Sequence, residues 1–128
     1  MERRAFEVSI LRDKYGEVET GANLEYIIFK NFRLPQGWNR ESTELLIIIP
    51  AGYPVTPPDN FYVAPGLRLQ TGAMPGNYSE GQQHFGRIWG VFSMHIEGGW
   101  TPSSNLMGGD NLITFMLTVV EKRLNELN

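Results

Sequence analysis

The chain has 128 residues, of which 41% are hydrophobic and 20% are charged, and its formal net charge is -3. This length suits one domain, residues 1–128, which can bury roughly two-thirds of the surface of its unfolded chain without a disulfide or a metal. The negative charge and the scattered basic residues argue against nucleic acid as a partner, because such binding is built from clustered Lys and Arg.

Three further absences in the sequence restrict the possible functions. No apolar run approaches the roughly 20 residues that a membrane span needs. The first residues, MERRAF, lack the apolar region of a signal peptide, so we expect a cytoplasmic protein without a membrane partner. There is no cysteine, which excludes disulfides, thiolate metal sites and a cysteine nucleophile.

The first half of the chain predicts one helix and then strands. Apolar residues recur at helical spacing from Arg3 to Tyr15, and Gly16 can end that helix. Leu24 to Phe32 and Thr43 to Ile49 are apolar and rich in branched side chains, as strands are. The residues between them, LPQGWNRES, are rich in turn formers, which favours an antiparallel meander.

The second half begins with segments that are poor in regular structure. Pro50 to Pro65 carries five prolines in sixteen residues, a density that leaves room only for a short strand at NFYV. From Gly66 to Gly90 we expect a long irregular connection with at most one short strand. A C-terminal helix follows an N-cap at Asp110 or Asn111. These elements predict an α+β fold, in which helices cover one face of an antiparallel meander sheet.

Four motifs in order along the chain point to a known family. They read LPQGW, LLIIIPAGYPVTPPDNF, FSMH and WTPSSNLMGGDNL. Their order resembles the ubiquitin-conjugating (UBC) fold, and the closest resemblance is to the prokaryotic UBC-like family E of bacterial ubiquitin-like conjugation systems. The resemblance covers about Leu24 to Leu124. It implies a single UBC-like domain whose sheet is flanked by an N-terminal and a C-terminal helix.

Ser93 stands where the family resemblance places the cysteine that forms a thioester. A thiolate is both a good nucleophile and a good leaving group near neutral pH, and a serine hydroxyl is neither. Two explanations remain open: a cysteine replaced by serine to disarm or trap the enzyme, or a natural variant that has lost catalysis. We favour the first because no other cysteine could substitute. The codon for position 93 in the native gene distinguishes them.

The two histidines are the further catalytic candidates. His84 lies near the place of the superfamily's His-Pro-Asn motif, but Phe85 and Gly86 follow it, so the usual asparagine donor is missing. His95 is two residues from Ser93 and would share its face in an extended segment, where it could act as a base toward an amine. A packed, hydrogen-bonded histidine is the alternative for both.

Other conspicuous residues have simpler structural interpretations. Asp59 is expected to be a turn residue and Asp110 a helix cap. No metal-ligand spacing, phosphate-binding loop or nucleophile elbow is present, so we expect neither a metal nor a cofactor. Support of the site is assigned to Tyr53, Pro54, Pro57, Pro58, Trp100 and Pro102.

Two functions follow from the resemblance. In the first, the chain is a conjugating transferase whose partners are a ThiF-like activating enzyme, a ubiquitin-like modifier and a target amine. The N-terminal helix, with Arg3, Arg4 and Arg12, is expected to contact that enzyme by analogy with the UBC fold. In the second, the chain is a non-catalytic UBC-like adaptor that binds the modifier or the activating enzyme.

Overall fold

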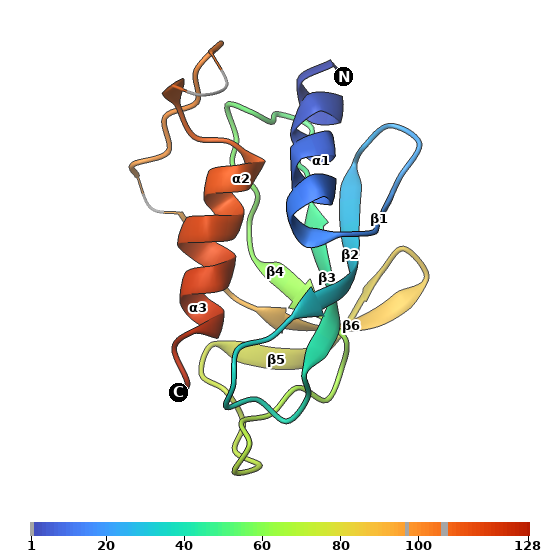
Figure 1. The fold of residues 1–128 in the computed structure, drawn as a ribbon, viewed down its shortest axis with the longest axis vertical. Helices are drawn as coiled ribbons and strands as arrows, with labels where there is room; N and C mark the ends of the chain where they lie inside the picture. Colours follow the sequence, from blue (N-terminus) through green and yellow to red (C-terminus); the bar gives the residue numbers. More distant parts are fainter. Residues whose placement is uncertain (1, 97, 106–107) are drawn as a thin grey trace.

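The computed structural model describes residues 2–96, 98–105 and 108–128, and its elements follow one another as the sequence predicts, with an additional short strand after the first helix and a two-stranded hairpin in the middle of the chain (Figure 1). In chain order the helices and strands are α1 (Glu2–Tyr15), β1 (Val18–Thr20), β2 (Tyr26–Arg33), β3 (Ser42–Ile48), β4 (Phe61–Val63), β5 (Tyr78–His84), β6 (Arg87–Phe92), α2 (Leu112–Phe115), the π-helical η2 (Met116–Glu121) and α3 (Lys122–Leu124).

The described strands form one six-stranded antiparallel sheet in the order β1-β2-β3-β4-β6-β5. The first four strands are a meander, because each pairs with the next one along the chain. The hairpin of β5 and β6 then joins the sheet through β6, which places β5 at the edge. The predicted α+β fold, a meander sheet with a helix from each end of the chain, is confirmed.

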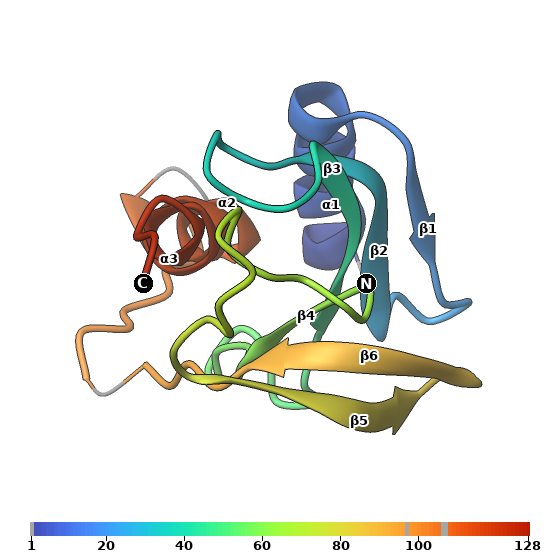
Figure 2. The same ribbon diagram turned by 90° about the horizontal axis from the view of Figure 1, so that it is seen from below.

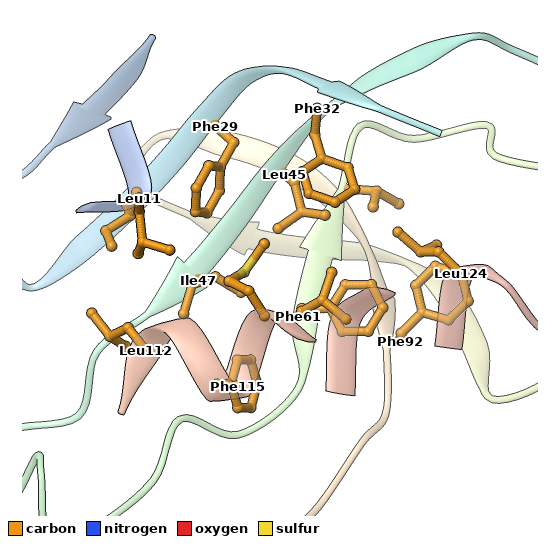
Figure 3. Packing of buried hydrophobic residues seen from close by; sticks show 14 of the residues in the cluster. Leu11, Phe29, Phe32, Leu45, Ile47, Phe61, Phe92, Leu112, Phe115 and Leu124 are labelled. Carbon is orange, nitrogen blue, oxygen red and sulfur yellow. The ribbon is translucent and has the colours of Figure 1, made fainter. Parts of the chain in front are cut away.

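The N-terminal helix α1 and the C-terminal helical segment from α2 to α3 pack on the same face of the sheet, and this layer holds the main hydrophobic core (Figure 3). Leu11 of α1 and Phe115 of α2 meet Phe29, Leu45 and other strand residues there, and all four side chains are at most 1% exposed. Each such side chain stabilises the fold by roughly 1.5–3 kcal/mol relative to an exposed one. In the described part of the chain, no helix combines the length and the apolar composition that crossing a bilayer requires.

The opposite face of the sheet carries a second, smaller apolar cluster. Its buried members come from four strands: Ile28, Leu46, Tyr62, Trp89 and Val91. The turn of the β5–β6 hairpin contributes to its cover, because the Phe85 ring lies 4.1 Å from the ring of Tyr26. The hairpin extends away from α1 on this side (Figure 2). Both faces of the central strands are therefore buried.

The expectation of an irregular connection from Gly66 to Gly90 is wrong, because this region contains β5 and most of β6. Two features explain why the sequence did not predict the hairpin of β5 and β6. As an edge strand, β5 is polar and mostly exposed, so it has no apolar alternation. Its two-residue turn, Phe85 and Gly86, has φ values of 55° and 75°, a conformation usually signalled by Asn-Gly or Asp-Gly.

The other local predictions agree with the structure. Between Pro50 and Pro65 the only strand is Phe61–Val63. Asn111, one of the two predicted cap residues, caps α2: its side chain accepts the Thr114 N–H at 3.0 Å. Asp110 instead accepts the backbone N–H of Thr101 at 2.8 Å, so it anchors the segment that leads into the helix.

Candidate active site

Ser93 is the first residue beyond β6 and lies in an irregular segment at the end of that strand. The side chains alternate through this region: Phe92 and Met94 belong to the main core, whereas Val91 belongs to the cluster on the other face. Ser93 and His95, at the alternate positions, are exposed. Alternation along an extended chain therefore places Ser93 and His95 on the same face, with Cβ atoms about 7 Å apart.

Two asparagines, each directly before a neighbouring strand, hold the backbone of this segment. The Ser93 N–H donates to the carbonyl of Asn77 at 2.8 Å. On the other side, the Met94 N–H donates to Oδ1 of Asn60 at 3.0 Å, and the Asn60 N–H donates to the Met94 carbonyl at 2.8 Å. Asn77 and Asn60 have φ values of 57° and 60°, which asparagine tolerates better than most residues.

These hydrogen bonds shift the register at Ser93. Phe61 of β4 is opposite Phe92, but the preceding residue, Asn60, is bonded to Met94, so Ser93 has no counterpart on the β4 side. Beyond this shift Met94 and Ile96 still belong to the main core, so Ser93 and His95 keep the alternate, exposed positions. The exposed hydroxyl of Ser93 is thus presented by a backbone that is bonded on both sides.

His95 is bonded to Asp59, with 2.5 Å between Nδ1 and Oδ1. A carboxylate only accepts hydrogen bonds, so Nδ1 carries the hydrogen, and Nε2 of the neutral ring is left as an acceptor. Both side chains are 61% exposed, so the pair can be reached from solvent. Asp59, expected from the sequence to be a turn residue, is thus the hydrogen-bond partner of His95.

His84 lies far from this group. It is the last residue of β5. The first residue of that strand, Tyr78, pairs with Phe92, which directly precedes Ser93. Six residue steps separate Tyr78 from His84, which is about 20 Å in a strand. At this position His84 is hydrogen-bonded to Gln82 at 3.1 Å, and its ring packs 4.8 Å from that of Tyr62. The structure brings His95, and not His84, together with Ser93.

The residues assigned to support the site fall into two segments that meet. The Trp100 Nε1–H donates to the carbonyl of Pro54 at 2.8 Å, and the Trp100 ring lies 6.5 Å from that of Tyr53. Pro57 and the buried Pro58 lead directly to Asp59 and Asn60. Pro102 is half-buried, two residues beyond Trp100.

A comparison with known protein families identifies the family of this chain. A family model described as prokaryotic E2 family E matches residues 9–127, which is nearly the whole chain. The chain belongs to this family. No curated protein and no solved structure matches it. Membership gives the protein a ubiquitin-conjugating-like role, with an activating enzyme and a modifier as the general kinds of partner.

In this E2-like protein a buried carboxylate links the N-terminal helix to the site. Glu7 of α1 is fully buried and accepts hydrogen bonds from the Tyr53 hydroxyl, from the Leu112 N–H at 2.8 Å and from Arg3 Nε at 2.9 Å. Burial, followed by the bond to Glu7, raises the pKa of Tyr53 well above its ordinary value. One side chain therefore connects α1, the Tyr-Pro turn and the start of α2.

Two of the three arginines expected to contact an activating enzyme are used inside the E2-like domain. Besides its bond to Glu7, Arg3 donates to the carbonyl of Ser103 at 2.5 Å. Arg4 donates to the carbonyls of Leu24 and Pro50 at 3.0 and 2.9 Å. Substituting them would disturb these internal contacts, so they are poor probes of docking. Arg12 is exposed in the last turn of α1.

A surface groove of about 420 Å³ lies beside the Ser93 segment. Its lining residues are Gly76, Asn77, Met94, Arg123, Glu126 and Asn128. Ser93 does not line the groove, but two residues beside it do: Asn77, whose carbonyl accepts the Ser93 N–H, and Met94, which follows Ser93 in the chain. Arg123 is 4% exposed and donates to the carbonyls of Gly76 and Glu126, which closes one side of the groove.

Three residues of this site had no clear signal in the sequence: Asp59, Asn60 and Asn77. Asp59 follows a proline, Asn77 follows a glycine and Asn60 follows Asp59, and Asp and Asn are common at such positions for conformational reasons alone. The one usable signal was that Asp59 and Asn60 directly follow the Tyr-Pro-x-x-Pro-Pro motif that carries the family resemblance.

Proposed function

We propose that this protein receives a ubiquitin-like modifier from a ThiF-like activating enzyme and holds it at position 93 for transfer to a target amine. The observation that carries the proposal is the exposure of Ser93 and His95 on one face of a fixed segment, in a chain of the prokaryotic E2 family E.

The chemistry at position 93 is acyl transfer. With a cysteine there, the sulfur attacks the carbonyl carbon of the incoming thioester, a thioester to the new sulfur forms, and the donor thiol leaves. With Ser93, the hydroxyl oxygen attacks instead and its proton passes to Nε2 of His95. The carbon–sulfur bond of the donor then breaks, the donor leaves as a thiolate that takes up a proton, and the product is an oxyester. A thioester reacts readily with amines, whereas an oxyester resists them. The serine form thus binds its partners and turns over slowly, as a trapped form would.

His95 has a second task in the transfer step. A target amine must lose a proton as it attacks the carbonyl carbon, and Nε2 of His95 is an acceptor on the same face as Ser93. General base catalysis of this kind contributes typically 10²- to 10⁴-fold. Ser93 is the attachment residue and His95 the base in this proposal, and His84 has no role because of its distance.

One observation favours a second function, that of a non-catalytic adaptor. The sequence has no cysteine at all, so no thioester can form on the chain as it stands. An adaptor would bind the modifier or the activating enzyme through the same fold and carry no covalent load.

The test is to restore the thiol. With ATP, modifier and activating enzyme, Ser93→Cys is expected to form an adduct that a reducing thiol removes, whereas the unchanged chain forms at most a slow adduct that resists thiol and is cleaved by hydroxide. Ser93→Ala is the control and should form neither. An unloaded Ser93→Cys protein, together with tight binding of free modifier and no binding of the activating enzyme, would support the adaptor instead.

A further inference from the structure

We infer that Asp59 is the positioning residue of His95: it fixes the imidazole with the hydrogen on Nδ1 and with Nε2 available to a reacting amine at position 93. The inference rests on the proposed function, because it gives Asp59 a part in that transfer. It assigns a residue that the family motifs had marked only as the end of a proline-rich turn.

The first support is the backbone that brings the two residues together. Asn60 and Met94 are bonded to each other through two hydrogen bonds, at 2.8 and 3.0 Å. Asp59 precedes Asn60, and His95 follows Met94, so in antiparallel register Asp59 and His95 are the next pair. Directly opposite residues of such a pair have Cβ atoms about 5 Å apart. The carboxylate is thus held beside the ring by backbone contacts and not by the ion pair itself.

The second support is the orientation of the ring. Nδ1 is the atom bonded to Asp59, so the free nitrogen is Nε2, on the far side of the imidazole. Since Ser93 shares the exposed face of His95, this nitrogen is on the side of the chain where a group attached at position 93 would lie. Without Asp59 the exposed ring could rotate and could carry its hydrogen on either nitrogen.

A purely structural surface pair is the competing interpretation. Exposed ion pairs contribute little to stability, and both partners here are 61% exposed. The ion pair of Lys30 and Glu19, at 3.3 Å, is a comparable example at the opposite edge of the sheet, between β1 and β2, where no reaction is proposed. Removing Glu19 therefore serves as the control for the loss of a surface carboxylate.

The experiment measures transfer without the unidentified partners. A short peptide ending in Gly-Gly, supplied as an alkyl thioester, is exchanged onto the thiol of Ser93→Cys, and its transfer to ethylamine is followed in single turnovers. Asp59→Ala is expected to lower the maximal rate about tenfold to hundredfold, within the range of general base catalysis. The apparent KM for ethylamine should stay within about twofold, and Glu19→Ala should change neither quantity.

Two further readouts separate positioning from a structural role. In a His95→Ala background, Asp59→Ala should have no additional effect, because Asp59 acts through His95. Nitrogen-15 NMR of the unchanged chain should show the hydrogen of the neutral His95 ring on Nδ1, and Asp59→Ala should remove that preference.

Three results would overturn the inference: an unchanged rate in Asp59→Ala, an equal loss with and without His95, or a hydrogen on Nε2 in the unchanged chain. Failure of the proposed function is seen separately, because enzymatic loading of Ser93→Cys would then be absent while the chemical transfer assay still reports on Asp59.

Discussion

Substitution of Glu7 tests whether one buried carboxylate joins the N-terminal helix to the rest of the domain. Glu7→Ala leaves the Tyr53 hydroxyl and the Leu112 N–H without their acceptor inside the protein. An unsatisfied buried polar group costs about 1–3 kcal/mol, and loss of one partner from a buried charged pair costs about 3–5 kcal/mol in total. The Arg3 side chain is 21% exposed and can turn to water. We therefore expect Glu7→Ala to lower the free energy of unfolding by about 3–4 kcal/mol, in the lower half of that range.

Urea unfolding followed by tryptophan fluorescence measures this loss directly. The midpoint should fall while the slope with urea stays the same, and the melting temperature should drop by roughly 10–15 °C for a domain of this size. Asp13→Ala is the control, because it removes an exposed carboxylate from the same helix and should change stability by at most about 0.5 kcal/mol. If Glu7→Ala costs less than about 1 kcal/mol, then Glu7 does not link these elements as described.

Two further predictions concern the edges of the site. The Tyr78 hydroxyl, the Arg68 guanidinium and a backbone N–H lower the pKa of Glu80 to about 2, so ionised Glu80 stabilises the fold above about pH 4.5, and this contribution is lost as the pH falls toward 2. Glu80→Gln should cost about 1 kcal/mol at pH 7, after allowance for solvent screening. The cost should be clearly smaller near pH 2, where about half of the Glu80 carboxyl groups are protonated in the folded chain, as urea titrations at the two pH values would reveal. An equal cost at both pH values would contradict the electrostatic account. Trp100→Phe loses the bond to the Pro54 carbonyl and should lower the free energy of unfolding by about 1–2 kcal/mol; no change would mean that this bond does not brace the segment.

The predictable parts of the fold were those rich in apolar residues. The N-terminal helix and the strands at Tyr26–Arg33 and Ser42–Ile48 were predicted to within two residues, the helix from the spacing of its apolar residues and the strands from their runs of apolar, branched side chains. Strand β5 lacks any such pattern, since an exposed edge strand buries almost nothing. It is held by its partner, β6, and pairing between strands has no local signature in the sequence.

The site, like the fold, was predictable only where the contact joins residues that are close in the sequence. The position of Ser93 beside His95 followed from their separation of two residues and from the family motifs. The bond between His95 and Asp59 joins residues 36 apart in the chain, and it depends on a one-residue register shift at Ser93. Register shifts are set by turns and side-chain bonds such as that of Asn60, which no hydrophobic pattern records.

The way Ser93 is held also determines what its replacement by cysteine can reveal. Its described hydrogen bond is made by its backbone N–H, which a cysteine would keep, and its side chain is exposed. Exchange of one oxygen for one sulfur at an exposed position leaves the core and α1 untouched. Binding of the activating enzyme to the serine chain and to Ser93→Cys should therefore agree within about 1 kcal/mol, the range of ordinary surface changes. A large difference in loading at equal affinity then belongs to the chemistry of the atom at position 93, whereas a large difference in affinity would mean that this atom itself lies in the docking surface.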